Sequence, residues 1–191
     1  MIAARRTLVL GGTRSGKSRH AEDLLPTDAP VCYLATGRYD PDDDEWAARI
    51  DAHRVRRPSG WETVETTDIT AAIRAGEDHP LLVDDLATWL SGVLDDAGAW
   101  TADALPPAVS RQVVELVEAV AGSTGRVVLV SAEVGLGVVP ATRVGRLFRD
   151  ELGTLNTALA AVCDEVLLLV AGLPLRLKEP PPARGDRPPP R

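Results

Sequence analysis

A glycine-rich segment near the start of the chain has the residue types and spacing of a phosphate-binding loop. Two glycines bracket four residues, and a lysine and a serine follow directly. Glycines let backbone N–H groups approach phosphate oxygens, the lysine reaches the β- and γ-phosphates, and the serine hydroxyl binds Mg²⁺. The segment consists of Gly11, Gly12, Thr13, Arg14, Ser15, Gly16, Lys17 and Ser18. It predicts a P-loop that binds a nucleoside triphosphate.

Two adjacent carboxylates follow an apolar run and are candidates for holding the metal ion of the nucleotide. Residues 81–83 are apolar, and Asp84 and Asp85 come next. In P-loop enzymes an acid at the end of a neighbouring strand holds Mg²⁺ together with the loop hydroxyl. We expect Ser18 and Asp84 to be the metal ligands. Asp85 is better suited to cap the helix that follows, since a side-chain oxygen there accepts a helix N–H.

A histidine beside an arginine cluster is the main candidate for a nucleophile. His53 precedes four residues with three guanidinium groups, Arg54, Val55, Arg56 and Arg57. Arginine binds phosphate through two parallel hydrogen bonds, and a neighbouring imidazole can attack phosphorus. However, Trp46, Ile50 and His53 share one face at helical spacing, so the residues alone favour a packed histidine. Of the other two histidines, His79 is expected to be solvated and His20 to be packed.

The elements that position these residues follow from the apolar pattern. Short aliphatic runs at residues 8–10, 31–35, 81–83, 127–130 and 166–170 suit parallel strands that are buried on both faces. Helical patterns lie between them at residues 18–25, 86–94, 109–120 and 144–162. The alternation predicts an α/β, P-loop NTPase-like fold, with a mostly parallel central sheet and helices on both faces.

Length and charge limit the choice of organisation and partner. The chain has 191 residues and a formal net charge of -7. We expect one nucleotide-binding catalytic domain over residues 1–178, followed by a proline-rich tail over residues 179–191 that is disordered because it buries no apolar area. The acidic charge disfavours nucleic acid as a partner. The first apolar run is too short for a signal peptide or a membrane span. Neither cysteine has metal-ligand spacing, and both are expected to be buried thiols in a reducing compartment. A cytoplasmic location is therefore expected.

Further segments match one enzyme family in order along the chain. They are residues 11–22, 33–37, 49–53, 57–58, 61–65, 83–90, 133–140, 148–150 with Gly153 and Asn156, and 171–175. Together they resemble the bifunctional adenosylcobinamide kinase/adenosylcobinamide-phosphate guanylyltransferases of cobalamin synthesis. Two departures stand out: the family often has asparagine where this chain has Ala132, and often an apolar residue or cysteine where it has Asp85. The second departure leaves either Asp84 or Asp85 open as the metal partner.

The resemblance implies two reactions. A nucleoside triphosphate, GTP or ATP, phosphorylates adenosylcobinamide, and GMP from GTP is then transferred to that phosphate through a GMP–histidine intermediate, giving adenosylcobinamide-GDP. The matching histidine is His53, so His53 and Lys17 are the expected catalytic residues. Mg²⁺ is the expected cofactor, and a homo-oligomer, with a trimer as one form, is the expected assembly. Beyond the P-loop, the implied nucleotide contacts are Ala35, Thr36, Gly37, Arg54, Val55, Arg56, Arg57, Glu65 and Asp84.

Three alternatives stay open at this point. The chain can be a monofunctional P-loop small-molecule kinase in which His53 is structural. It can be a nucleotide-binding switch without turnover, although no switch segment is evident. A nucleic-acid motor is the third, and the acidic charge disfavours it.

Overall fold

The computed structural model describes residues 4–37, 58–76 and 79–180. Seven strands form a single sheet in the order β3-β2-β4-β5-β1-β6-β7. All neighbouring pairs are parallel except β6 and β7, which form an antiparallel hairpin at one edge. The strands are β1 (Arg6–Gly11), β2 (Val31–Ala35), β3 (Trp61–Glu65), β4 (Leu81–Asp84), β5 (Val127–Ala132), β6 (Glu165–Val170) and β7 (Leu173–Lys178).

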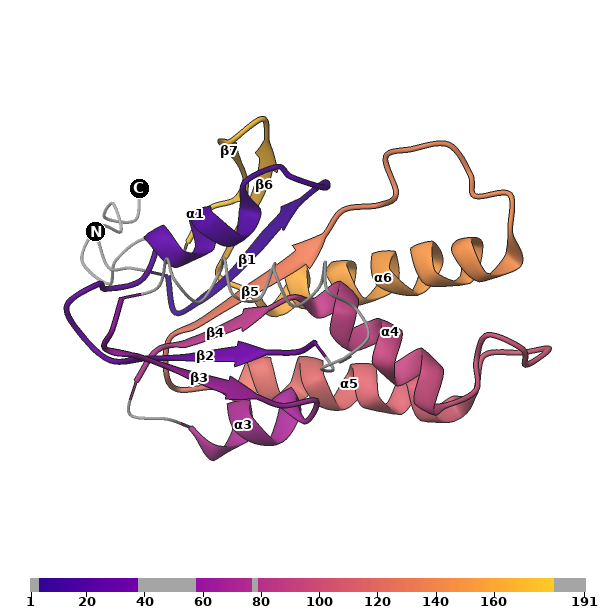
Figure 1. The fold of residues 1–191 in the computed structure, drawn as a ribbon, viewed down its shortest axis with the longest axis horizontal. Helices are drawn as coiled ribbons and strands as arrows, with labels where there is room; N and C mark the ends of the chain where they lie inside the picture. Colours follow the sequence, from indigo (N-terminus) through magenta and orange to yellow (C-terminus); the bar gives the residue numbers. More distant parts are fainter. Residues whose placement is uncertain (1–3, 38–57, 77–78, 181–191) are drawn as a thin grey trace, which may run out of the picture.

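Helices cover both faces of this sheet (Figure 1). One face carries α1 (Lys17–Asp23), and the other carries α3 (Ile69–Ala75), α4 (Leu86–Asp96), α5 (Pro107–Gly122) and α6 (Arg143–Val162). The predicted α/β fold with a mostly parallel sheet between helical layers is therefore confirmed.

Alternate residues of each central strand enter the two halves of the core. In β1, Leu8 and Leu10 pack among the side chains of α3 to α6, whereas Val9 packs with Ala21 of α1 and Tyr33 of β2. Leu8 and Val9 are both fully buried. Burial on both faces explains why these strands are continuous apolar runs in the sequence.

Three elements have no counterpart in the sequence prediction. The edge strand β3 contains two glutamates, so it is not a continuous apolar run, and the edge strand β7 has every residue exposed. The third, α3, has only seven residues. The predicted apolar stripe of α6 also begins too early, because Val144 is 44% exposed while Leu152 is fully buried.

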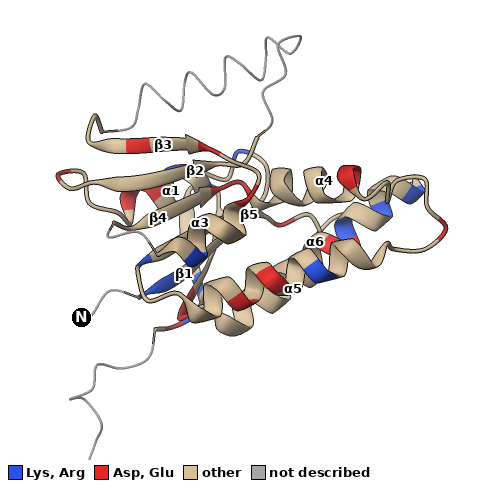
Figure 2. Ribbon diagram, turned by 90° about the horizontal axis from the view of Figure 1, so that it is seen from below, with Lys and Arg blue, Asp and Glu red and all other residues tan. Residues whose placement is uncertain are grey.

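Some predictions fall on residues outside the described part of the chain. They are a helix leading to His53, the arginine cluster that follows it, and nearly all of the proline-rich tail. Within residues 4–37, 58–76 and 79–180, no helix is long and apolar enough to cross a membrane. Acidic and basic residues are interspersed over most of the ribbon, and the first turns of α6 carry several basic residues (Figure 2).

Candidate active site

The P-loop connects the end of β1 to the start of α1, in the conformation that its glycines permit. Gly16 has a φ of 90°, in the left-handed region that favours glycine. A Cβ at Gly11 would lie 2.3 Å from Ser15 Oγ and 3.0 Å from the Leu169 carbonyl oxygen, so the fold has no room for a larger residue there. The tight loop after a buried strand is therefore a consequence of glycine at these two positions.

The hairpin between β6 and β7 supports the loop from the side. Gly172 N donates a hydrogen bond to the Ser15 carbonyl oxygen at 3.0 Å, and Gly172 also has a left-handed φ of 81°. Lys17 lies at the start of α1, and its Nζ is 3.5 Å from the Gly12 carbonyl oxygen. The ammonium group thus stays beside the backbone that would surround a triphosphate.

The predicted metal ligands Ser18 and Asp84 lie next to each other. Ser18 Oγ donates a hydrogen bond to Asp84 Oδ1 at 3.1 Å, and Tyr33 Oη donates one to Asp84 Oδ2 at 2.7 Å. Parallel strands β1, β2 and β4 place their carboxyl ends at the same edge of the sheet, which is where open α/β sheets bind ligands. The hydroxyl, the carboxylate and the phosphate-binding loop therefore meet there.

Asp85 has the capping role expected from the sequence. Its side chain accepts a hydrogen bond from Ala87 N at 2.9 Å and caps the start of α4. Burial raises the pKa of the Asp85 carboxyl to about 6, with a further increase from the neighbouring Asp84. Asp84 therefore contacts the P-loop, whereas the carboxylate of Asp85 turns toward the helix.

Thr36 joins the ends of β2 and β4. Its Oγ1 donates to the Asp85 carbonyl oxygen at 2.7 Å and accepts from Asp85 N at 3.1 Å. Thr36 is only 2% exposed, while its neighbours Ala35 and Gly37 are half-buried. The Thr36 hydroxyl therefore both donates to and accepts from the Asp85 backbone, and these two hydrogen bonds fix the local shape of the sheet edge.

Glu65, another predicted nucleotide contact, is not brought to the P-loop. Glu65 is exposed at the end of β3, paired in register with Ala35. Three strands separate β3 from β1, which corresponds to roughly 19 Å across the sheet at about 4.8 Å per strand. His53, Arg54, Val55, Arg56 and Arg57 lie outside the described residues.

Sequence reasoning missed Tyr33 as part of the site. It lies in an apolar run and is 3% exposed, so its pattern is that of a core residue. Its hydroxyl nevertheless reaches the Asp84 carboxylate. The available signal was chemical, because a buried tyrosine hydroxyl requires a hydrogen-bond partner.

The backbone at Ala132, where the family often has asparagine, is held by helix α6. Asn156 of α6 is 6% exposed, and its Nδ2 donates to the Ala132 carbonyl oxygen at 3.0 Å. Ser131 Oγ donates to Asn156 Oδ1 at 2.6 Å. The end of β5 thus receives an amide side chain from the helix, and Glu133 N continues the connection by donating to the Gly11 carbonyl oxygen.

Comparison with solved structures agrees with the fold. An assembled type III secretion ATPase, EscN from enteropathogenic E. coli, superposes with a TM-score of 0.50 and 17% identity, over 88% of this chain and 43% of that chain. A prototypical type III secretion ATPase of pathogenic bacteria gives a TM-score of 0.52 and 16% identity, over 86% of this chain and 51% of that one. At these identities the likeness shows the P-loop ATPase fold alone.

Sequence comparison is more specific. The bifunctional adenosylcobalamin biosynthesis protein CobU of Escherichia coli is 39% identical over 180 residues, covering 90% of this chain and 98% of that protein. CobP of Pseudomonas aeruginosa, with the same description, is 41% identical over 182 residues, covering 92% and 99%. The model of the family "Cobinamide kinase / cobinamide phosphate guanyltransferase" matches residues 7–177. The chain therefore belongs to the cobinamide kinase/cobinamide phosphate guanyltransferase family.

Proposed function

We propose that this enzyme phosphorylates the alcohol of adenosylcobinamide with GTP or ATP and then transfers GMP from GTP to the new phosphate. The observation that carries the proposal is the meeting of a P-loop with the Ser18–Asp84 pair, 3.1 Å apart, in a chain of this family. A nucleoside triphosphate needs both parts, because the loop binds its phosphates and the oxygen pair binds its metal ion.

Ser18 and Asp84 fit Mg²⁺ by their chemistry. Mg²⁺ prefers oxygen ligands and is usually held by one or two protein oxygens, with phosphates and water completing its shell. One hydroxyl and one carboxylate at this position meet that requirement, and Tyr33 orients the carboxylate from behind. When bound, the ion supplies positive charge to the phosphate oxygens.

In the kinase step the loop serves the γ-phosphoryl group. Backbone N–H groups of Gly12 to Ser18 and the Lys17 ammonium stabilise negative charge on the transferred group and on the departing β-phosphate oxygen. The alcohol of the corrinoid must approach from the open side of the sheet edge, in line with the bond that breaks. Most of the rate gain in this step comes from positioning and charge stabilisation.

In the second step the broken bond lies between the α- and β-phosphates. We infer that His53 attacks the α-phosphorus as a neutral imidazole, pyrophosphate leaves, and the corrinoid phosphate then displaces the histidine from GMP. The same loop holds the leaving pyrophosphate, and Arg54, Arg56 and Arg57 bind the triphosphate beside the histidine. Two successive displacements retain the configuration at phosphorus.

Labelled GTP tests this division of labour. Label in the α position should remain on the denatured protein in an acid-labile, alkali-stable bond, whereas label in the γ position should not. His53→Ala should lose this adduct and the GMP transfer but keep the phosphorylation. His79→Ala is the matched control, because His79 is exposed and distant in sequence from the arginine cluster.

Two outcomes would change the assignment. An enzyme that phosphorylates the corrinoid but never retains α label is a monofunctional kinase with a structural His53. Loss of both activities in a folded His53→Ala protein would show that the two steps are not divided as described.

We also propose a cytoplasmic homo-oligomer, with a trimer as the expected form. The cytoplasmic location is supported by the burial of both cysteines, Cys32 and Cys163. Assembly is supported by edge strand β7, where Leu173, Leu175 and Leu177 are 72%, 56% and 55% exposed. Exposed leucines along a sheet edge favour burial against a partner. Analytical ultracentrifugation of the protein and of a Leu175→Arg variant measures the assembly, and a monomeric parent protein would contradict it.

A further inference from the structure

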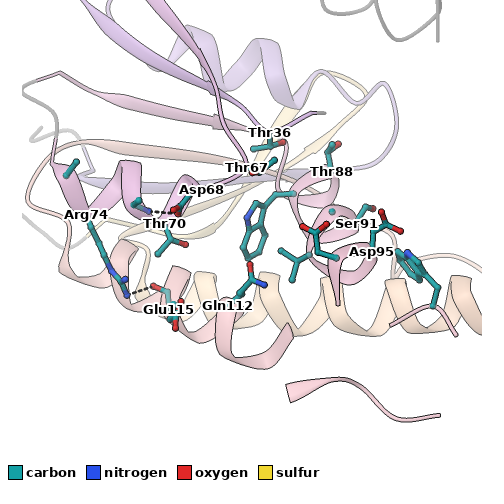
Figure 3. Close-up of a pocket in the computed structure, with 17 residues that line it drawn as sticks. Thr36, Thr67, Asp68, Thr70, Arg74, Thr88, Ser91, Asp95, Gln112 and Glu115 are labelled. Carbon is teal, nitrogen blue, oxygen red and sulfur yellow. Dashed lines mark hydrogen bonds between the residues drawn. The ribbon is translucent and has the colours of Figure 1, made fainter. Parts of the chain in front are cut away.

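A large cavity lies outside the P-loop, between α3, α4 and α5 (Figure 3). Its volume is about 1120 Å³, above the roughly 300–1,000 Å³ of most small-molecule sites. In the close-up, Thr36, Thr67 and Thr88 lie near the sheet edge, Arg74, Gln112 and Glu115 lie along α3 and α5, and Ser91 and Asp95 lie on α4. A cavity of this size can hold a ligand larger than a nucleotide.

The cavity exists because α3 and α4 both pack on α5 and have little direct contact with each other. Helix α4 is amphipathic, with its apolar face toward the core and its polar face toward the cavity. Leu86, Leu90 and Leu94 of α4 are fully buried in the core, and the other face presents small or polar residues, among them Thr88, Ser91 and Asp95, to the cavity. These side chains leave the space between the two helices unfilled.

A short chain of contacts connects this cavity to the metal position. Ser18 bonds to Asp84, the next residue Asp85 caps α4, and the Asp85 backbone is bonded to Thr36, which lines the cavity. Thr88 lies in the first turn of α4, three residues after Asp85. One end of the cavity is therefore at the same sheet edge as the P-loop, and the rest extends away from it along α4.

The lining offers hydrogen-bonding groups, some apolar surface and negative charge. Hydroxyls of Thr70, Thr88 and Ser91 and the amide of Gln112 line it, together with the indoles of Trp89 and Trp100. It contains four carboxylates and one guanidinium group, those of Asp68, Asp95, Asp96, Glu115 and Arg74. The end of α4 is acidic in Figure 2, where Asp95 and Asp96 are exposed.

We propose that this cavity binds the corrin macrocycle of the cobinamide substrate, with its alcohol arm directed past Thr36 toward the P-loop. The inference rests on the proposed function, since it assigns the binding site of that substrate. A corrin is a large, flat ring edged by amide groups, which need donors and acceptors around an apolar surface. An alkylcobalt(III) corrin without a phosphate carries one positive charge, which matches the net negative lining.

The charge pattern also sets the orientation. Asp95 and Asp96 attract the cationic ring to the far end of α4, and they disfavour a phosphate there. The alcohol that becomes a phosphate should thus lie at the opposite end, beside Thr36 and Thr88. This orientation presents the reacting oxygen to the triphosphate while the ring stays in the cavity.

Steady-state kinetics with adenosylcobinamide test the assignment. Ser91→Trp places a large side chain in the cavity and should raise the KM for adenosylcobinamide at least tenfold. Asp95→Asn combined with Asp96→Asn should raise it about three- to tenfold, as expected for two solvent-exposed charge interactions. In both variants the affinity for a fluorescent GTP analogue should stay within twofold of the parent protein.

The control pair Asp103→Asn and Glu118→Gln removes two exposed carboxylates outside the cavity and should leave the corrinoid KM unchanged. If Ser91→Trp does not fold, the exposed Asp95 and Asp96 pair decides the question. Unchanged KM values in cavity variants that still form product would overturn the corrin site and leave the proposed function intact. A parent protein that never phosphorylates adenosylcobinamide would instead refute the proposed function, and the corrin site with it.

Discussion

Removing the Tyr33 hydroxyl tests how the proposed metal position is built. Tyr33 Oη donates a 2.7 Å hydrogen bond to Asp84 Oδ2, while Ser18 Oγ bonds to the other carboxylate oxygen. Tyr33→Phe keeps the ring in its buried place and removes only the hydroxyl that orients Asp84. Hydrogen bonds that orient a metal ligand typically contribute about 10- to 100-fold to metal affinity. We expect a Mg²⁺ requirement raised by roughly that factor.

The structure also gives the expected effect on stability. A hydrogen bond to a charged group contributes about 1.5–3 kcal/mol. The free energy of unfolding of the variant should therefore be lower than that of the parent by up to about 3 kcal/mol. Because the bound nucleotide and metal are otherwise unchanged, kcat at saturating Mg²⁺ should remain within about threefold of the parent enzyme. The phosphorylation rate measured against Mg²⁺ concentration, at fixed GTP and corrinoid, reports the Mg²⁺ requirement and kcat.

A double-mutant cycle separates orientation from other effects of the hydroxyl. With Asp84→Asn already present, the carboxylate is gone and Tyr33→Phe should change the Mg²⁺ requirement by less than about twofold. Equal effects of Tyr33→Phe in both backgrounds would refute the reasoning. Tighter Mg²⁺ binding in the single variant would also refute it, because the hydroxyl would then act by withdrawing charge from Asp84.

Three further predictions concern the loop and its support. Gly11→Ala should weaken GTP binding at least tenfold, because the new Cβ would meet Ser15 Oγ at 2.3 Å. Gly12→Ala should weaken GTP binding clearly less, because a Cβ there has nothing within 4 Å. Equal losses of affinity in a GTP titration would contradict this. Asp164→Asn should destabilise the fold by about 1–3 kcal/mol at pH 7, because its hydrogen bond with Arg6 at 2.8 Å lowers the pKa of Asp164. That contribution is present above the unfolded pKa of about 3.9 and is lost as the pH falls through the folded value, so the difference from the parent should shrink below about pH 4 in urea titrations. Asn156→Ala should cost about 2–3 kcal/mol in the same titrations, because two buried hydrogen bonds disappear; a change under about 0.5 kcal/mol would contradict the contacts described.

Much of the central fold could be predicted from the sequence because burial leaves a simple pattern there. Strands β1, β2, β4, β5 and β6 are buried on both faces and are therefore continuous apolar runs. The edge strands of the sheet could not be predicted, because they are not buried on both faces. A strand such as β3, with glutamates at two of five positions, or β7, with every residue exposed, carries no such run.

The site divides in a similar way. The P-loop and Asp84 are recognisable because their chemistry requires particular residue types at short spacing or directly after a strand. The Tyr33–Asp84 contact joins residues 51 positions apart, and the cavity between α3, α4 and α5 depends on helix packing. Both depend on contacts between distant segments, and no local pattern encodes such contacts. The position of Asp85 directly before an apolar helix predicts that its carboxylate caps the helix, and the structure confirms that role.

The mass of the corrinoid product tests the central claim most directly. The purified protein is incubated with adenosylcobinamide, GTP and Mg²⁺, and the corrinoids are separated and weighed over time, beside a Lys17→Ala variant. Adenosylcobinamide should first gain one phosphoryl group and then a GMP unit, and the variant should form neither product at a comparable rate. An unmodified corrinoid with the parent protein, or equal turnover by Lys17→Ala, would contradict it.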